Sequence, residues 1–202
     1  MGASIKPWHW LLAALVLFGA VHWLRHRPIH PPPGVLVADD PVQATLDDAK
    51  PFEIDDGRYR IQPLASFDIT ARVLSVENYH LDRMAPLVPT DLALGWGPMS
   101  DSAVLADIDI DQGDRFYFWH VDHFPIERRD IEIHSANMHL IPADAHVRRE
   151  ISQVRIGQVV HFAGDLVEVK AQDGWTLRSS LTREDTGPGA CEVVWVTDFE
   201  LR

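Results

Sequence analysis

Cysteine is nearly absent from this sequence, since Cys191 is the only one among 202 residues. One thiol cannot form an intramolecular disulfide, so the fold does not rest on a disulfide framework, and no cysteine pair exists to bind zinc. Basic residues are also few: 18 Lys and Arg face 30 Asp and Glu, which gives a net charge of −12 with histidine neutral. An acidic chain repels phosphate backbones, so we expect no nucleic acid among its partners.

Familiar catalytic signatures are missing as well. The chain has no HExxH helix, no GxxxxGKS/T phosphate loop and no serine in a GxSxG context. The DTG triplet at 185–187 matches aspartic proteases, but charged residues precede it where that site needs an apolar strand, so we interpret it as a turn. Cys191 begins an apolar segment, which favours a buried structural thiol over a nucleophile. These absences favour a protein that is not an enzyme, and they leave the question open.

One long apolar run is present near the N-terminus. After a short tail (residues 1–7), residues 8–24 read WHWLLAALVLFGAVHWL and contain no Asp, Glu, Lys or Arg. As an α-helix they would rise about 26 Å, enough for a thin bilayer, and tryptophans at both ends suit the headgroup region. We predict an uncleaved transmembrane signal anchor with the lipid bilayer as its partner. A cleaved signal peptide would place Leu17 or Phe18 at the −3 position, which fits poorly, and a buried core helix is the third alternative.

Residues 25–51 contain six prolines, including the run at 31–33, and this composition excludes a helix. We predict a stiff spacer between the membrane and a domain at 52–202; a docking peptide is the alternative, and GVLV at 34–37 could add to a sheet edge. Basic residues flank the apolar run almost equally, so the positive-inside rule gives little preference. We expect a single-pass protein of the bacterial inner membrane with its C-terminal domain in the periplasm.

The domain at 52–202 has the pattern of a mostly β protein. Residues 67–76 alternate apolar and polar side chains, which is the period of a half-buried strand. Further strands are predicted at 114–121, 131–134, 158–163, 166–171, 175–181 and 191–201, with tight turns at 164–165 and 173–174. Short helices are predicted at 90–97, in SDSAVLADIDI before a strand, and at 143–151. We therefore predict an α+β fold, mostly β, with a small barrel-like or strongly bent antiparallel sheet and a few short helices.

The order of strands resembles oligonucleotide/oligosaccharide-binding (OB) or SH3-like barrels, a likeness of fold that does not imply a function. Four segments, DLALGWGPMSD, HSANMHLIPA, GQVVHFAGDLVEV and DTGPGACEVVWV, resemble an uncharacterised family of bacterial membrane-anchored proteins. That resemblance implies a setting in the bacterial envelope and carries no known activity.

Three histidines lie close together in HSANMHLIPADAH, residues 134–146. His134 at a strand end, His139 in a loop and His146 at a helix start could converge on a zinc ion, which would make the protein a metal-assisted hydrolase. A second pair, in HVDH at 120–123, would point to opposite faces of a strand. The spacings match no strong metal signature, so we expect scattered histidines that bond backbone groups, and no cofactor.

Binding, rather than chemistry, is the function we predict. Asn137 and His139 are expected to clamp the backbone of a loop. Tryptophans are usually core residues, but two exposed along one face of a β-rich domain would suit a peptide or a glycan. We expect the domain to be a protein-binding or assembly module for another envelope protein. The candidate binding residues are His134, Asn137, His139, Trp96 and Trp119.

Overall fold

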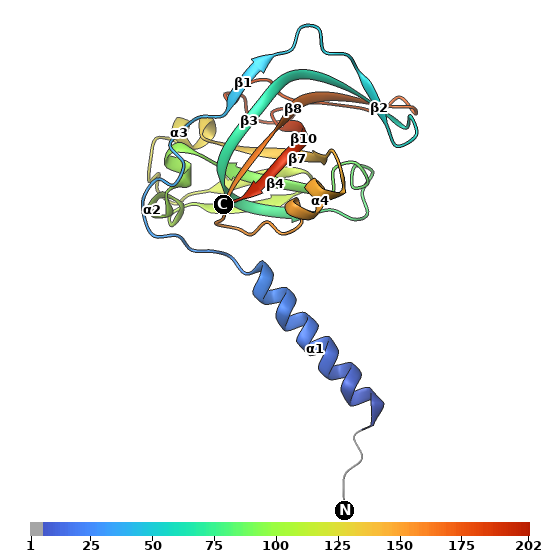
Figure 1. Ribbon diagram of the computed structural model, residues 1–202. Helices are drawn as coiled ribbons and strands as arrows, with labels where there is room; N and C mark the ends of the chain where they lie inside the picture. Colours follow the sequence, from blue (N-terminus) through green and yellow to red (C-terminus); the bar gives the residue numbers. More distant parts are fainter. Residues whose placement is uncertain (1–5) are drawn as a thin grey trace, which may run out of the picture.

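The computed structural model describes residues 6–202, and its centre is a ring of five strands (Figure 1). These strands are β3 (Tyr59–Asn78), β4 (Thr90–Gly95), β7 (Ser135–Pro142), β8 (Val159–Ala171) and β10 (Glu192–Leu201). Going round the ring, β3 pairs with β4, β4 with β7, β7 with β10, β10 with β8, and β8 again with β3. The mostly β fold with a strongly bent sheet is confirmed, and the parallel β7–β10 pair makes the sheet mixed rather than purely antiparallel.

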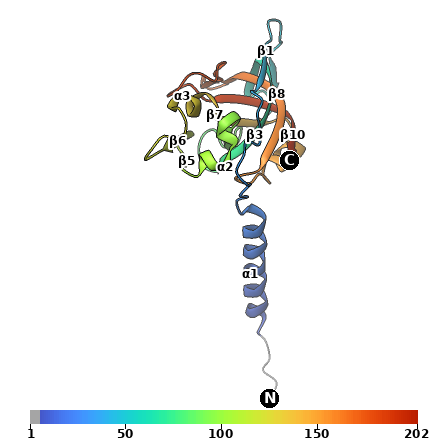
Figure 2. The same ribbon diagram turned by 90° about the vertical axis from the view of Figure 1, so that its left-hand side faces the viewer.

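Short elements extend this ring. β1 (Val42–Thr45) and β2 (Phe52–Ile54) pair with β3, and β9 (Thr176–Arg178) pairs with β8. A separate hairpin lies outside the ring and consists of β5 (Asp109–Gly113) and β6 (Phe116–His120). The helices are α1 (Pro7–His26), η1 (Gly97–Ser100), α2 (Ser102–Leu105), α3 (Arg128–Ile133) and α4 (Ala145–Ile151). The insertion between β4 and β7, which contains the hairpin and α3, flanks one side of the ring (Figure 2).

Strand β3 closes the ring because it is long enough to serve two neighbours. It pairs with β8 over residues 59–72 and with β4 over residues 72–78. A register irregularity between Val73 and Ser75 marks the bend at this change of partner. The strand predicted at 67–76 lies within β3 and is confirmed, and its predicted apolar face is buried in the core.

Strand β8 is continuous, so the tight turn predicted at 164–165 between two strands is wrong. At Gly164 a Cβ atom would lie 1.9 Å from the carbonyl oxygen of Trp195 on β10. The glycine is therefore required by the close approach of a neighbouring strand rather than by a turn. The turn predicted at 173–174 is confirmed, since Gly174 has a positive φ in the turn between β8 and β9.

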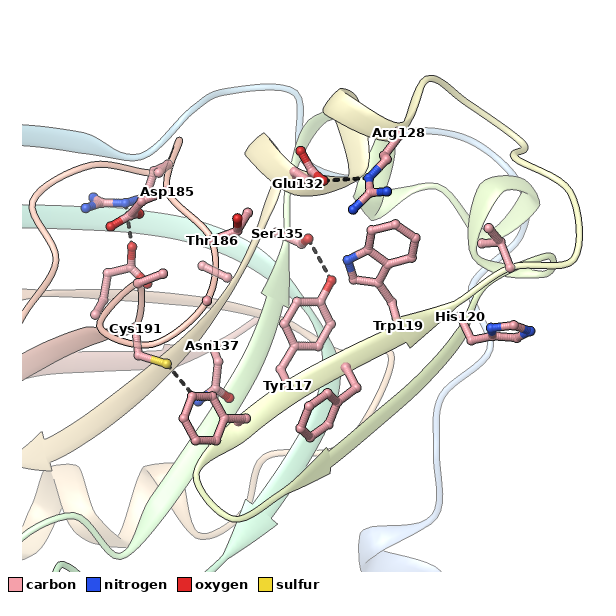
Figure 3. Close-up of a pocket in the computed structure, with 18 of the residues that line it drawn as sticks. Tyr117, Trp119, His120, Arg128, Glu132, Ser135, Asn137, Asp185, Thr186 and Cys191 are labelled. Carbon is pink, nitrogen blue, oxygen red and sulfur yellow. Dashed lines mark hydrogen bonds and ion pairs between the residues drawn. The ribbon is translucent and has the colours of Figure 1, made fainter.

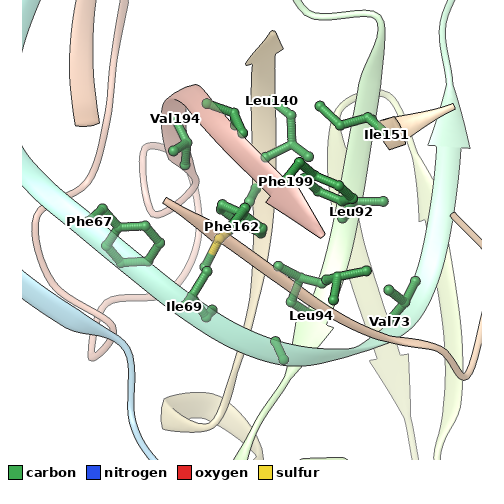
Figure 4. Close-up of a cluster of buried hydrophobic side chains, with 14 of the residues drawn as sticks. Phe67, Ile69, Val73, Leu92, Leu94, Leu140, Ile151, Phe162, Val194 and Phe199 are labelled. Carbon is green, nitrogen blue, oxygen red and sulfur yellow. The ribbon is translucent and has the colours of Figure 1, made fainter. Parts of the chain in front are cut away.

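Apolar side chains fill the inside of the ring (Figure 4). Phe162 on β8 stacks on Phe199 on β10 with ring centroids 5.7 Å apart. Helix α4, predicted at 143–151, packs Val147 and Ile151 against this core. Each such side chain contributes roughly 1.5–3 kcal/mol on burial. The core residues labelled in the figure are Phe67, Ile69, Val73, Leu92, Leu94, Leu140, Ile151, Phe162, Val194 and Phe199.

Three segments differ from their predicted structure. The segment predicted as a helix at 90–97 contains strand β4. This strand pairs with a neighbour on each side, and all its residues are buried. The strand predicted at 131–134 is the last turn of α3 and its C-cap. The strand end, clamped loop and extended LIP predicted within 134–142 are one strand, β7, from Ser135 onwards. Strands buried on both faces lack the alternation that identifies a strand in sequence, which explains the errors at β4 and β7.

The N-terminal helix and the proline-rich segment behave differently from each other. Helix α1 includes the predicted helix at 8–24 and leads away from the domain (Figures 1 and 2). Among the described residues, no helix combines the length and hydropathy needed to cross a membrane. The predicted spacer at 25–51 instead lies along the domain: Ile29 N–H donates to the Ile156 carbonyl, and β1 pairs with β3. Residues 34–37 form no strand, and two of their N–H groups donate to Ser100 Oγ.

Candidate functional site

A cleft of about 600 Å³ lies where the β5–β6 hairpin, α3, the start of β7 and the loop before β10 meet (Figure 3). Its aromatic wall consists of Phe116, Tyr117, Phe118, Trp119 and Phe124. Its polar lining consists of His120, Arg128, Glu132, Ser135, Asn137, Arg183, Asp185, Thr186, Cys191 and Glu192. The cleft thus has one apolar side and one side rich in hydrogen-bonding groups, as ligand sites commonly have.

Every residue of β6 lines the cleft. The alternation of the strand leaves Phe116 and Phe118 39% and 55% exposed and turns Tyr117 inward. The Tyr117 hydroxyl is hydrogen-bonded to Ser135 Oγ at 2.8 Å, and burial raises the Tyr117 pKa to about 12, against a smaller opposing effect of that bond. Tyr117 therefore stays neutral and fixes the hairpin to β7, while the phenylalanines remain available to a ligand.

The tip of the hairpin is fastened to the ring by Arg115. This residue has a φ of 70°, a left-handed conformation that ordinary side chains adopt only at a cost. Its guanidinium group stacks on the Tyr79 ring at 3.5 Å and contacts the carboxylates of Asp82 and Asp91 at 2.8 and 3.0 Å. These contacts compensate for the strained backbone and hold the position of β6 beside the ring.

One side chain of β7, Asn137, forms part of the floor of the site, and a second, His139, is buried behind it. Asn137 accepts a hydrogen bond from Gln112 Nε2 at 2.7 Å and donates to the Arg115 carbonyl at 3.1 Å, so it ties the hairpin to the ring. Its Nδ2 atom also lies 3.8 Å from Cys191 Sγ. His139 is 5% exposed, and its Nδ1 atom lies 2.9 Å from Asp91 Oδ1. Both residues lie on a strand and not in the predicted loop; Asn137 does bond backbone, at the turn of the hairpin, whereas His139 contacts the Asp91 side chain.

His139 carries a positive charge at neutral pH. Burial lowers its pKa, but hydrogen bonding to Asp91 and Cys191 and the charges of these groups outweigh burial and raise the pKa to about 9. The β4–β7 register explains the pairing, because it places Asp91 directly opposite His139. A fully buried carboxylate is thereby balanced by an imidazolium on one side and by Arg115 on the other.

A second buried carboxylate, Glu192, lines the cleft at the start of β10. Burial raises its pKa to about 7, although Arg183 lowers it, with Nε 2.7 Å from Glu192 Oε1. The loop that carries Arg183 is tied down by Ser180 Oγ, which donates to Asp185 Oδ2 at 2.8 Å. The cleft therefore contains an acid that exchanges protons near neutral pH.

The zinc set predicted from sequence is not brought together. His134 ends α3 with its ring 2.9 Å from the Asp130 carbonyl, His139 lies on β7, and His146 lies at the start of α4. Within the described residues, the one group of potential ligands that meets is His161, Asp198 and Glu200, none of them predicted. The pair at 120–123 borders a separate hollow of about 470 Å³ that also contains Asp107, Asp109 and Asp122.

The two predicted tryptophans have different positions. Trp119 lines the cleft, with the Arg128 guanidinium 5.7 Å from its ring centre. Trp96 is 1% exposed in the core and is not accessible to a ligand, so its assignment as a binding residue is wrong. Of the predicted binding residues, Asn137 and Trp119 line the cleft and His139 lies just behind it.

Asp91, Arg115, Arg183, Cys191 and Glu192 were not among the predicted site residues. A usable signal existed for two of them: Asp91 and Glu192 are single charges within apolar runs, LVPTDLALG and CEVVWV. Buried charges are rare unless they are paired or functional, so a single charge within an apolar run indicates a candidate site residue. No protein-family model, curated protein or solved structure matches this chain. The site is therefore interpreted from its own geometry.

Proposed function

We propose that this protein is a membrane-attached binding module whose cleft takes up an extended, mainly apolar segment of another envelope protein. The single observation that carries the proposal is the edge of β6, which runs along the cleft beside two exposed phenylalanines. Within residues 6–202, β6 pairs with β5 alone. An unpaired strand edge offers a row of N–H and C=O groups to which an extended peptide can add as a further strand.

The side chains around this edge support a peptide with apolar anchors. Phe116 and Phe118 point to the same side of β6, so a partner strand would place alternate side chains against them. Charges in the cleft are already largely paired, Arg128 with Glu132 and Arg183 with Glu192. The net charge of −12 opposes acidic partners and favours basic residues beside the apolar anchors.

The order of the strands in the ring also supports a ligand site on the side of the domain where the cleft lies. We number the ring strands one to five along the chain: β3, β4, β7, β8 and β10. Going round the ring, they follow the order 1-2-3-5-4 and return to 1, and α4 connects the third strand to the fourth. This is the arrangement of an OB-type barrel, which binds ligands on the face of its second and third strands and with the flanking loops. The cleft borders that face at β7 and the loop before β10. The acidic charge favours a peptide over an oligonucleotide, and an oligosaccharide is the competing ligand.

Helix α1 supports attachment to a membrane. Its described apolar side chains, among them Trp10, Leu15, Phe18 and Trp23, are exposed on all sides. An isolated helix with apolar side chains all round is stable only when another apolar phase covers it. We place the domain on the periplasmic side of a bacterial inner membrane. Alkaline extraction of membranes should leave the full chain in the pellet and release a chain that begins at Arg27.

The binding proposal is tested with a displayed library of short random peptides and the domain as bait. We expect selected peptides to carry aromatic or aliphatic residues at alternate positions. Phe118→Ala should weaken binding of such a peptide at least tenfold, roughly 1.4 kcal/mol, because it removes an exposed anchor of the wall. Leu81→Ala is the matched control, since Leu81 is 99% exposed and lies outside the cleft. Equal affinity in both variants, or failure of the library to yield any binding peptide, would contradict the proposal.

A further inference from the structure

We propose that Cys191, His139 and Asp91 form a nucleophilic thiol site at the floor of the cleft, suited to transfer or hydrolysis of an acyl group from an ester or thioester. This inference goes beyond the proposed binding function, because a peptide-binding edge needs none of the three side chains. Two other candidates are weaker: the hollow beside residues 120–123 and the group at His161, because the acids at both are exposed.

The strand pairing brings the three groups to one face of the ring. Asp91 on β4 lies opposite His139 on β7, and Val193 on β10 lies opposite His139 on the other side. Cys191 lies just before β10, and its Sγ atom lies 3.8 Å from Asn137 Nδ2 on the outer face of β7. Asp91 and His139 are therefore fixed by paired strands, and the thiol lies where the chain enters β10.

His139 is oriented by Asp91. Its Nδ1 atom lies 2.9 Å from Asp91 Oδ1, and its ring also interacts with the Cys191 thiol. Arg115 contacts the same carboxylate oxygen at 3.0 Å and fixes it from the other side. Because His139 is already protonated near neutral pH, it pairs with the Cys191 thiolate as an imidazolium and then protonates the leaving group as a general acid. Asp91 acts through His139 and is a positioning residue.

The sulfur is the member of the site that a ligand can reach. Cys191 is partly exposed and lines the cleft, while Asp91 and His139 are buried behind it. A structural thiol packs among apolar side chains, but Sγ here lies 3.8 Å from Asn137 Nδ2 and 3.9 Å from the Arg115 carbonyl. The Asn137 amide is placed to donate to an oxygen that becomes negative beside the sulfur.

The reaction is balanced with water as the only co-reactant. The Cys191 thiolate, paired with the protonated His139, attacks the carbonyl carbon, so that an S–C bond forms and an electron pair of the carbonyl double bond moves to oxygen. Collapse of this intermediate breaks the bond to the alcohol or thiol, which leaves with the proton from His139. Water then gives a proton to His139 and attacks the acyl carbon, the S–C bond breaks, and the carboxylic acid is released.

The first experiment measures alkylation of Cys191 by iodoacetamide, followed by intact mass. Because the chain has one cysteine, every adduct reports this site. At about pH 6 we expect the native full chain to react at least tenfold faster than the same chain unfolded in guanidinium, since an imidazolium stabilises a neighbouring thiolate. His139→Gln should abolish that advantage. A native rate equal to or below the unfolded rate, or one unchanged by His139→Gln, would overturn the proposal.

The second experiment uses p-nitrophenyl butyrate as the acyl donor. We expect a mass increase of one butyryl group on the native chain, followed by steady release of nitrophenol, and neither in Cys191→Ala. Asn137→Ala should slow acylation about a hundredfold while the iodoacetamide rate changes little, because alkylation forms no oxyanion. Asp91→Asn should shift the pH profile of acylation, an effect that a purely structural role would not produce. Failure to form the adduct would rule out acyl transfer.

The outcome is separable from that of the proposed function. Phe118→Ala removes the aromatic anchor and leaves Cys191, His139 and Asp91 in place. We expect this variant to lose peptide binding and to keep the iodoacetamide rate of the unchanged chain. Loss of the rate advantage in His139→Gln with intact peptide binding would show the reverse separation. A reactive thiol without peptide binding would support this inference and reject the binding module.

Discussion

The two faces of β7 are both buried, yet they differ in chemistry. Met138 and Leu140 point into the ring and pack in its apolar core. Asn137 and His139 point outward, where the hairpin, the neighbouring strands and Cys191 surround them with polar groups. A buried apolar face needs only suitable volume, whereas a buried polar face is stable only when each charge has a partner. The polar groups of the outer face must therefore be positioned more exactly than the apolar side chains of the core. We place the functional site on the outer face.

The largest expected effects are losses of stability, which we compare between one substitution in the outer polar cluster and one on the inner face of β7. Asp91→Ala leaves His139 and Arg115 without their shared carboxylate, and we expect a loss of about 3–5 kcal/mol in the free energy of unfolding. Leu140→Ala on the inner face should cost about 2–5 kcal/mol through the cavity it creates. Urea unfolding measures both. A cost below about 1 kcal/mol for Asp91→Ala would show that the outer cluster is not a stabilising network.

A smaller effect is the pH dependence contributed by His139. Because its pKa is raised from 6.5 to about 9 on folding, its stabilising contribution is complete below pH 6.5 and is lost as the pH rises through 9. The melting temperature should fall by about 5 °C across this window. His139→Gln should remove that fall. An identical pH profile in the variant would mean that the imidazole is neutral in the folded protein.

An effect of similar size concerns Glu192, the second buried acid. Its pKa rises from 4.5 to about 7 on folding, so the neutral carboxyl favours the folded state below pH 4.5 and this contribution is lost as the pH rises through 7. Glu192→Gln should remove a fall of about 5 °C in melting temperature over that range, because the pKa of Glu192 rises on folding as much as that of His139. The control is Glu200→Gln, an exposed carboxylate on the same strand, which should leave the profile unchanged.

The inner face of the ring could be predicted from sequence more easily than the outer one. The alternation at 67–76 and the helix predicted at 143–151 rest on local signals, and both predictions hold. The site depends on contacts between distant segments: the parallel β7–β10 pairing places Cys191 beside Asn137, 54 residues apart. No periodicity reports such a pairing. Of the histidines proposed for zinc, His139 does belong to the site, but its partners are a carboxylate and a thiol.

The most direct test of the binding module is amide hydrogen exchange of β6, measured with and without a selected peptide. If the peptide adds to the open edge, alternate N–H groups within Phe116–His120 that face the cleft should exchange more slowly in the complex, because they gain hydrogen bonds. The amides of β2, none of whose residues lines the cleft, should be unaffected. Tight binding of the peptide with unchanged exchange in β6 would contradict the account.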